Sequence, residues 1–398
     1  AYAQASALAI MDSTQLPYVQ ELNAYLEGLN AFMQDGPTPP EFHLMGIEKK
    51  NFELVDLFYI TGALSYNFSQ APKTDPIVDF VSKQYGEEHL RDIALYHDST
   101  ESFIPSNNRE IQLAQLQQLI QDMEMVSGQI PYPPLDGSNA WAISGKKTKS
   151  GKALFCNDTH IGYMLPQTWY EAHIACPGFE MYGHFLAGVP FALIGRNQHL
   201  SWGVTMLLND DMDYYAETLN PKNNQEILVG NRTYPIRAIT ETIHVKGEED
   251  TTITRKIGPH GPLVNEVTQH LTGTTPIALH WTYTQKENHT FKGFWMMNQS
   301  TNLDEFQLGL PLIHAPGISL NYADENGNIA WFATASLKMR NPNENSWTIL
   351  SGNDSTSMNV HYYPFAPDFV MLLVDLLVVQ SLQAQSELEH SHPFLQAT

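Results

Sequence analysis

The stretch "LDGSNAWAISG", residues 135–145, marks the point at which the character of the chain changes. A proline-rich linker at 130–134 precedes it, and residues Ala140 to Ser144 have the pattern of a short strand. Asp-Gly and Ser-Gly pairs mark turns in most proteins, so a tight turn before a strand is one interpretation. The other interpretation is that the chain is cut between Gly137 and Ser138, which would make Ser138 a new N-terminus.

A serine at a free N-terminus is a catalytic arrangement in its own right. The terminal amine has a pKa of about 7.7 to 8.0, so its neutral fraction can act as base for the serine hydroxyl. An internal serine lacks this amine, and the chemistry therefore requires cleavage after Gly137. Glycine on that side suits a backbone that must bend for the hydroxyl of Ser138 to attack the preceding carbonyl. The letters "GSN" by themselves are a weak indication.

The chain before this point has a helical pattern. Apolar residues recur at helical spacing from Leu22 to Phe32, and "DG" followed by "PTPP" ends that helix. Similar stretches run from Phe52 to Tyr66 and from Ile111 to Met123. The sequence therefore predicts a helical region over 1–127, followed by a linker over 128–137 that ends at the predicted cleavage site.

The chain after Ser138 has the pattern of strands. Runs such as "AWAISG", "LSWGVTM", "IALHWTY" (277–283) and "ISLNYADENGNIAWF" are separated by turn residues, which is typical of a strand-rich body. Helices followed by strands favour the α+β class. We expect residues 138–365 to form this strand-rich region.

The composition limits the possible partners. The chain has 398 residues, of which 42% are hydrophobic, enough for a sizeable core. Its 43 acidic and 21 basic residues give a net charge of −22, which repels phosphate backbones and argues against nucleic acid as a partner. The longest apolar run, Phe369 to Val379, is interrupted by Asp375 and is too short to cross a bilayer, so no membrane partner is predicted.

Several blocks along the chain carry more specific information. After Ser138 come "SNAWAISG", "CNDTHIG", "FALIGRNQHLSWGVTMLLNDDMDYYAE", "GPHGPLV" and "NYADENGNIAWF"; "YLEGLNAFM", "PPEFHLMGI" and "DLFYITGALSYNF" lie upstream. With these blocks in this order, the chain resembles the penicillin acylase (penicillin amidase) family of N-terminal-nucleophile hydrolases over roughly residues 1–365. The resemblance implies an αββα sandwich in which Ser138 starts a central strand, with 1–127 similar to the family's α-subunit and 138–365 similar to its β-subunit.

The resemblance also implies catalytic roles for individual residues. Ser138 takes the place of the nucleophile, and its freed amine that of the general base. His160 stands where the family has a residue that contacts the substrate amide and the terminal amine; a hydrogen-bonded loop histidine is the alternative. Met206 stands where a backbone N–H helps to stabilise the oxyanion, a role that does not depend on the side chain. A plain strand residue is the alternative for Met206.

Three apolar positions correspond to the family's acyl pocket. They are Phe68, Ile161 and Ile194, and packing in the core would account for each of them equally well. Two of the three are aliphatic where phenylacetyl-selective enzymes use aromatic residues. An aliphatic acyl chain is therefore expected rather than a benzyl group.

The acidic segment "NDDMD", residues 209–213, matches the family's calcium ligands. Asp210, Asp213 and the carbonyl of Met212 supply oxygen donors of the kind that calcium prefers. Asp75 is the candidate for a further carboxylate from the helical region. The prediction is one bound calcium ion, and a solvated acidic turn is the alternative.

The function implied by the resemblance is hydrolysis of a linear amide. The substrate would be a β-lactam antibiotic or an N-acyl amino compound, including acyl-homoserine lactones, and the reaction would pass through an acyl-enzyme on Ser138. Cleavage at Gly137–Ser138 would leave two pieces of one precursor paired as a heterodimer. A periplasmic or secreted location is expected with this family.

The chain also departs from the family pattern. Residues 366–398 match nothing in the family, and the asparagine that serves as its second oxyanion donor is not found. The opening residues have neither the family's first strand nor a signal peptide. The chain is therefore expected to be a fragment, and the alternative function is that of a catalytically silent, calcium-stabilised piece of such an enzyme. Cleavage between Gly137 and Ser138 separates the two possibilities.

Overall fold

The structure of the chain is a computed structural model. It describes residues 2–11, 13–69, 71–86, 89–90, 135–161, 165, 167–207, 209–265, 275–285, 287–341, 344–365, 371–372 and 376–380. The predicted helix from Ile111 to Met123, most of the linker at 128–137 and most of the tail at 366–398 lie outside these residues.

The N-terminal part consists of helices. They are α1 (Tyr2–Met11), α2 (Pro17–Asp35), α3 (Pro40–Met45), α4 (Leu54–Phe68) and α5 (Ala71–Tyr85). The predicted helix at Leu22–Phe32 is confirmed as part of α2, and the one at Phe52–Tyr66 is confirmed by α4, which begins at Leu54 and ends at Phe68. Proline occupies the first turn of α2, where no backbone donor is lost. Glu53 and Asp56 cap the start of α4 reciprocally.

Strands dominate the chain from residue 135 onward. They are β1 (Leu135–Ile143), β2 (Leu154–Ile161), β3 (Trp169–Cys176), β4 (Phe179–Leu186), β5 (Ile194–Asn197), β6 (Leu200–Met206), β7 (Met212–Ala216), β8 (Thr218–Asn220), β9 (Asn223–Val229), β10 (Arg232–Pro235), β11 (Arg237–Ile243), β12 (Thr251–Ile257), β13 (Ile277–Trp281), β14 (Ile318–Asp324), β15 (Ile329–Thr334), β16 (Leu350–Ser351), β17 (Met371–Leu372) and β18 (Leu376–Gln380). Helices α8 (Thr282–Gln285), α9 (Thr290–Gln299) and α10 (Leu303–Gly309) lie between β13 and β14. One short 3-10 turn, Gly145–Lys147, lies between β1 and β2, and another, Leu310–Leu312, follows α10.

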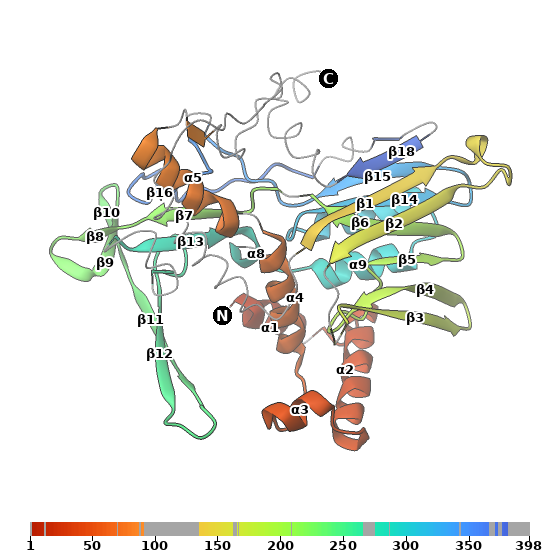
Figure 1. The fold of residues 1–398 in the computed structure, drawn as a ribbon, viewed down its shortest axis with the longest axis horizontal. Helices are drawn as coiled ribbons and strands as arrows, with labels where there is room; N and C mark the ends of the chain where they lie inside the picture. Colours follow the sequence, from red (N-terminus) through yellow and green to blue (C-terminus); the bar gives the residue numbers. More distant parts are fainter. Residues whose placement is uncertain are drawn as a thin grey trace.

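Two antiparallel sheets pack face to face, and the smaller one contains Ser138, the predicted nucleophile. The larger has the order β17-β15-β14-β6-β5-β4-β3, and the smaller has the order β18-β1-β2 (Figure 1). Small residues, Ala140 and Ala142, are buried along β1, whereas Trp141 between them is 38% exposed. Gly203 leaves room for Asn157, whose Nδ2 donates to the Val204 carbonyl at 3.0 Å and so joins the two sheets. Buried and exposed side chains therefore alternate along β1 because one face of this strand lies against the larger sheet.

Helices cover the other face of the larger sheet (Figure 1). Buried Leu22 and Phe58 from the N-terminal helices share one core with Trp202 of β6, Phe294 of α9 and Tyr322 of β14. The α+β class is confirmed, with helices, a large sheet and a small sheet as three successive layers. A fourth layer, which the αββα sandwich requires, is not seen among the described residues.

The remaining strands form smaller sheets at one end of the molecule (Figure 1). Their orders are β13-β7-β16, β10-β9-β8 and β11-β12, and α5 contacts β7. The strand predicted at 277–283 ends at Trp281, and helix α8 follows. The reason is tertiary, because the hydroxyl of Tyr283 donates to the Phe58 carbonyl of α4 at 2.8 Å.

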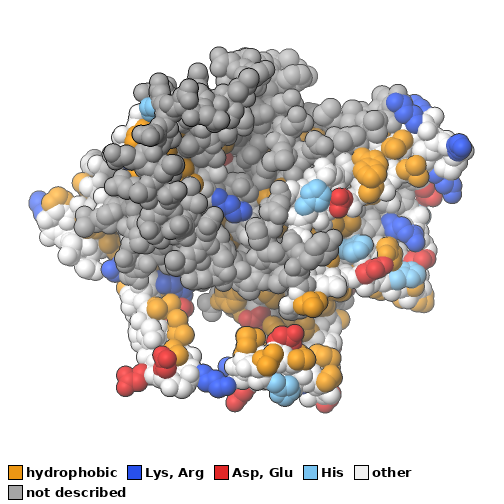
Figure 2. All heavy atoms as spheres, viewed as in Figure 1, with side chains coloured by type: hydrophobic (Ala, Val, Ile, Leu, Met, Phe, Trp, Pro, Cys, Tyr) orange, Lys and Arg blue, Asp and Glu red, His pale blue; other side chains and the backbone are white. Residues whose placement is uncertain are grey.

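The surface is uneven in character. Figure 2 shows apolar side chains gathered at the lower edge of the view, over α2 and α3. Phe32, Leu44 and Met45 are among the exposed large apolar residues there. No helix of the described ranges combines the length and the apolar character that a bilayer crossing needs.

Candidate active site

Ser138 lies inside β1 and is 3% exposed. It stands opposite Thr159 of β2, and its Oγ donates to the carbonyl oxygen of Gly137 at 2.6 Å. The strand begins at Leu135 and continues through the Gly137–Ser138 junction, so Ser138 does not start the strand as expected. The physical reason is that residues on both sides of the junction are paired with β2 while the chain is uncut.

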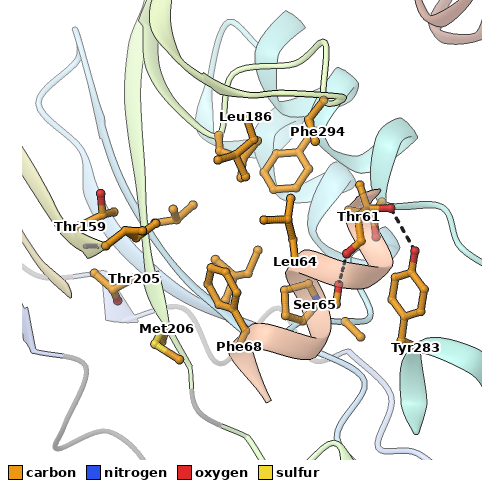
Figure 3. Close-up of a pocket in the computed structure, with 18 of the residues that line it drawn as sticks. Thr61, Leu64, Ser65, Phe68, Thr159, Leu186, Thr205, Met206, Tyr283 and Phe294 are labelled. Atoms are coloured by element: carbon orange, nitrogen blue, oxygen red, sulfur yellow. Dashed lines mark hydrogen bonds between the residues drawn. The ribbon is translucent and has the colours of Figure 1, made fainter. Parts of the chain in front are cut away.

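Ser138 borders an apolar cavity of about 60 Å³. Figure 3 shows Leu64, Leu186 and Phe294 projecting into its middle from α4, the end of β4 and α9. Thr159 of β2 lies at one end of the view. The cavity is therefore a space between the helical layer and the two sheets, with the serine in its wall.

The structure brings two of the three predicted pocket residues to this cavity. Phe68, at the end of α4, and Ile161, at the end of β2, both line it. Ile194 is not among the lining residues, but its neighbour Leu193 is. Ile194 begins β5, where it pairs with His184 and packs against the main core.

Met206 also lines the cavity and is buried. It is the last residue of β6, opposite Ile318 of β14. Ser138 and Met206 therefore reach the same cavity from the two facing sheets. The oxyanion role of the Met206 backbone stays a prediction.

His160 lies one position from Thr159 along β2, opposite Gly137. Its side chain is 45% exposed, and its Nε2 lies 3.0 Å from Asp158 Oδ2 and 3.3 Å from Asn139 Nδ2. Successive side chains of a strand point to opposite faces, so His160 faces away from the cavity that Thr159 borders. Its contact with the terminal amine stays a prediction, because no free amine exists in the uncut chain.

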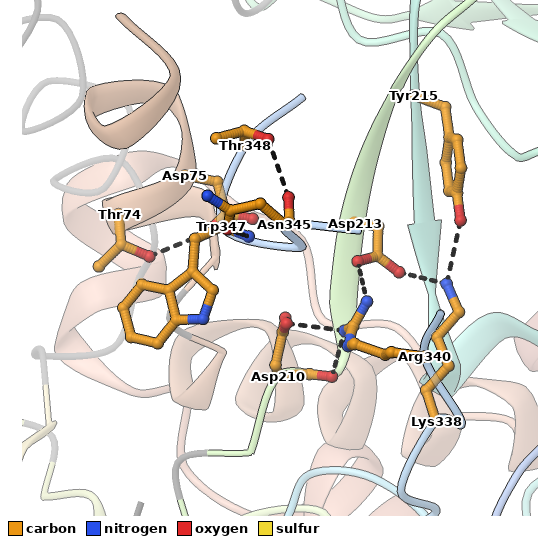
Figure 4. A network of polar contacts seen from close by, with 10 residues as sticks. All are labelled: Thr74, Asp75, Asp210, Asp213, Tyr215, Lys338, Arg340, Asn345, Trp347 and Thr348. Atoms are coloured by element: carbon orange, nitrogen blue, oxygen red, sulfur yellow. Dashed lines mark hydrogen bonds and ion pairs between the residues drawn. The ribbon is translucent and has the colours of Figure 1, made fainter. Parts of the chain in front are cut away.

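The predicted calcium ligands lie in a second, charged region (Figure 4). Arg340 stands between Asp210 and Asp213, with Nη2–Oδ2 at 2.7 Å to the first and Nη1–Oδ1 at 2.5 Å to the second. Lys338 pairs with the other oxygen of Asp213 and donates to the Tyr215 hydroxyl at 3.2 Å. Sequence reasoning missed both cations, since neither lies near the aspartates along the chain.

We name Asp75, Asp210, Asp213, Lys338 and Arg340 the acid cluster. Burial alone would raise the pKa of Asp213, but Arg340 and Lys338 hold it below its usual value. Burial, followed by the charge of Asp210, raises the pKa of Asp75 well above its usual value. The Oδ2 of Asp75 is buried and has no hydrogen-bond partner in the described part of the chain. The two cations therefore neutralise Asp213 more fully than Asp75.

Comparison with known families identifies the chain. The family model described as penicillin amidase matches residues 1–368. The chain belongs to the penicillin amidase family. This match covers the helical region and the strand-rich region on both sides of Ser138.

Individual relatives of this chain carry the names of acylases. The acyl-homoserine lactone acylase QuiP of Pseudomonas aeruginosa is 31% identical over 206 residues, which is 50% of this chain and 24% of that protein. The penicillin acylase 2 proenzyme of Pseudomonas sp. strain SE83 is 25% identical over 255 residues, 61% of this chain and 32% of that protein. The chain thus spans a quarter to a third of the length of these curated relatives.

A solved structure shares the fold. The thermostable penicillin G acylase from Alcaligenes faecalis superposes with a TM-score of 0.53 and 22% identity. The superposition covers 61% of this chain and 43% of that one. At this identity the match concerns the fold alone.

The donors that the family resemblance implies for calcium were tested against this geometry. Arg340 occupies the space between Asp210 and Asp213, and Met212 is fully buried in β7. No group of three acidic, histidine or cysteine side chains converges on a metal position within the described ranges. As they lie, Asp75, Asp210 and Asp213 do not form a calcium shell. Calcium binding, which the family resemblance implies, and its absence, which this geometry favours, are therefore two competing predictions, and no step of the mechanism depends on either.

Proposed function

We propose that this penicillin amidase-family chain belongs to an amide hydrolase that cuts itself between Gly137 and Ser138 and then uses Ser138 as its nucleophile. The observation that supports this most is the position of the serine. It is a buried hydroxyl, 2.6 Å from the carbonyl oxygen of a preceding glycine, in the wall of an apolar cavity. Self-cleavage would supply the amine that an internal serine lacks.

The cleavage is an N-to-O acyl shift followed by hydrolysis. Ser138 Oγ attacks the carbonyl carbon of Gly137, the bond from that carbon to the Ser138 nitrogen breaks, and the hydroxyl proton ends on the nitrogen. Water then hydrolyses the ester, which yields the Gly137 carboxylate and a free Ser138 amine. The hydrogen bond from Oγ to the Gly137 oxygen already holds the attacking and attacked groups together.

Turnover repeats the same attack on a substrate amide. The Ser138 amine takes the hydroxyl proton, Oγ bonds to the amide carbon, and the proton passes to the leaving amine. Water, activated by the same amine, then releases the acid from the acyl-enzyme. Met206 is proposed to donate its backbone N–H to the oxyanion, and His160 to contact the new amine after the chain end has moved.

The substrate is proposed to be a small N-acyl amide with an aliphatic acyl chain. Aliphatic Leu64, Ile161 and Leu186 line the cavity beside aromatic Phe68 and Phe294. The relatives named above act on acyl-homoserine lactones or penicillins according to their names, and both contain a linear amide. We favour the acyl-homoserine lactone type, since that relative is the more similar in sequence.

The two pieces are proposed to stay together as a heterodimer after cleavage. Phe58 of α4 packs edge-on against Phe291 of α9 with ring centroids 5.1 Å apart, and Leu22 and Leu57 are fully buried in the same core. Separation would expose this shared core to water. A periplasmic or secreted location is proposed from family membership alone.

Intact mass and amide hydrolysis, measured on protein expressed from its complete reading frame, test this function. The mass should show two pieces divided after Gly137, and chromogenic acyl anilides should be hydrolysed. Ser138→Ala should abolish both, because one oxygen attacks in each step. Ser138→Cys should still cleave itself but turn over amides poorly.

The competing function is that of a catalytically silent fragment, stabilised by calcium. Such a fragment should stay uncut and inactive in the same measurements. Vigorous hydrolysis by an uncut chain would refute the proposed mechanism, since internal Ser138 has no amine.

A further inference from the structure

The side chain of Asn157, in β2, binds two strands that belong to different sheets. Its Nδ2 donates to the carbonyl oxygens of Asn139 in β1 and Val204 in β6, at 3.0 Å each. Its Oδ1 accepts from the Val204 backbone N–H, also at 3.0 Å. A carboxamide offers one oxygen and two N–H hydrogens, so these three bonds occupy the whole group and fix its orientation.

Asn157 binds β6 at an open edge. Strand β5 pairs with β6 at Ser201 and Trp202, and this ladder does not continue to Val204 among the described residues. On its other side, β6 pairs with β14 as far as Met206. The carboxamide of Asn157 therefore satisfies the N–H and the carbonyl of Val204 in the way that a neighbouring strand would.

The site for this carboxamide depends on a glycine. A Cβ added at Gly203 would lie 2.6 Å from Asn157 Oδ1 and 2.9 Å from Asn157 Cβ, which is closer than such atoms can pack. A side chain at position 203 would therefore push the carboxamide away from β6.

The bridge joins the two parts of the proposed reaction. Asn139 directly follows Ser138 in β1, and Val204 precedes Met206 by two positions in β6. Backbone N–H groups point to alternate sides along a strand, so those of Val204 and Met206 point to the same open edge. Strands β1 and β6 belong to different sheets and share no ladder (Figure 1). Their relative position therefore depends on packing and on bridges such as this one.

We propose that Asn157 is a positioning residue for the nucleophile and the oxyanion donor. It holds β6 against β1 and so sets the distance from Ser138 Oγ to the Met206 N–H, in self-cleavage and in turnover alike. The inference rests on the proposed function, including the role proposed there for Met206. A misplacement of about 1 Å can cost about 100-fold in rate, so loss of the bridge should slow both steps and leave substrate binding intact.

The rate of self-cleavage tests the inference, followed by intact mass after cell-free synthesis of the complete protein. Asn157→Ala removes all three bonds and should slow cleavage about 100-fold. Gly203→Ala keeps the carboxamide but fills its space, and should slow cleavage at least about 10-fold. In the fraction that has cut, kcat for acyl anilides should fall by similar factors while KM stays within about twofold.

Asn157→Asp gives a measurement that a merely structural role would not move. The ionised carboxylate still accepts from the Val204 N–H, but it places an oxygen against the carbonyls of Asn139 and Val204. The protonated carboxyl regains one donor. Relative to the wild type, cleavage of Asn157→Asp should therefore rise about 10-fold from about pH 7.5 to about pH 5, and that of Asn157→Ala should stay constant.

Asn197→Ala is the matched control. Asn197, in β5, makes a comparable set of bonds and does not line the cavity. Its Oδ1 accepts from the N–H groups of His199 and Leu200 at 2.9 and 3.0 Å. Its Nδ2 donates to the carbonyls of Asn298 and Ser300 at 3.2 and 2.7 Å. This variant should melt at a lower temperature but cut itself within about twofold of the wild-type rate.

Thermal melting reports whether each variant folds, and Asn157→Asp and Gly203→Ala test the inference should Asn157→Ala unfold. Three results would each overturn it: wild-type cleavage rates in the Asn157 and Gly203 variants, a pH dependence of Asn157→Asp no different from that of Asn157→Ala, or equal slowing by Asn197→Ala. A wild-type protein that stays uncut would overturn the proposed function, on which the inference rests.

Discussion

The cavity beside Ser138 and the acid cluster are both buried, but they are built from opposite materials. The cavity is lined by aliphatic and aromatic side chains and a few hydroxyls, with no charged group among its described lining residues. In the acid cluster, Arg340 pairs with Asp210 and Asp213 and Lys338 pairs with Asp213, while Asp75 lies close enough to feel their charges (Figure 4). The cavity leaves space for a ligand, whereas in the acid cluster the side chains of Lys338 and Arg340 occupy the space beside the carboxylates.

The difference shows how each region meets the cost of burial. Apolar walls lose little when a cavity stays empty, apart from the contacts that a filled core would add. Buried charges must be paired where they lie, because an unpaired charge costs several kcal/mol. The cavity is therefore suited to bind and release a ligand. The ion pairs of the acid cluster are suited to hold β7 and the neighbouring loops in place.

Removal of a cation from the acid cluster should have the largest effect on stability. Arg340→Leu leaves Asp210 and Asp213 with one cation fewer, and we expect a loss of about 3–5 kcal/mol in the free energy of unfolding. Urea denaturation measures it. Arg196→Leu is the control, since Arg196 is exposed over the Tyr182 ring and should cost less than about 1 kcal/mol. Similar losses for both variants would contradict the role given to Arg340.

The pH dependence of stability should report Asp211, which lies next to the acid cluster along the chain. Burial raises its pKa from 3.8 to about 6. Between these two values the folded carboxyl keeps a proton that the unfolded one has lost, so stability falls as pH rises from about 4 to 6 and stays lower above it.

Asp211→Asn should remove the part of this dependence that comes from Asp211. The hydrogen bonds from Ser69 Oγ and Trp281 Nε1 both go to Oδ2, at 3.2 Å each, and an amide oxygen in that place accepts them. The variant should match the wild type near pH 3.5 and exceed it by up to about 3 kcal/mol at pH 7. Urea denaturation across this range measures the difference, and a difference that does not change with pH would refute the assignment.

A truncation in the cavity wall should cost less than the same change in the solid core. Leu64→Ala enlarges a space that already exists, so we expect a loss of about 2 kcal/mol, the low end for such changes. Leu57→Ala, in the same helix but fully buried in the main core, should cost about 3–5 kcal/mol. Equal losses in thermal or urea unfolding would mean that the cavity collapses in solution.

The smallest expected effect is that of calcium on the wild-type protein. With Arg340 between the aspartates, we expect calcium and a chelator to change the melting temperature by less than about 1 °C. The Arg340→Leu variant opens the carboxylates and should be stabilised by millimolar calcium. A drop of several degrees in the wild type on addition of chelator would instead support the calcium site implied by the family resemblance.

Much of the fold was readable from local patterns. The periodicity around Leu22 and in "DLFYITGALSYNF" predicted α2 and α4, because one face of each helix had to be apolar. "LSWGVTM" matches β6 from end to end. By contrast, "IALHWTY" looked like one strand, and only the reach of Tyr283 to Phe58 of α4 explains why it turns into α8 after Trp281.

The candidate site was readable only where it depends on chain order. Gly137 and Ser138 are neighbours in sequence, so their relation did not require the fold. Asn157 lies in the quoted block "CNDTHIG", but its bond to Val204 of the facing sheet could not be seen there.

The sequence by itself determined the order of helices and strands, the Gly137–Ser138 junction and the membership in the penicillin amidase family, because periodicity, turn residues and motifs are all written along the chain. The tertiary structure decided which side chains meet. It put Phe68 and Ile161 but not Ile194 into the cavity, and it turned His160 away from it. These outcomes depend on strand register and packing, since one position along a strand reverses the face to which a side chain points.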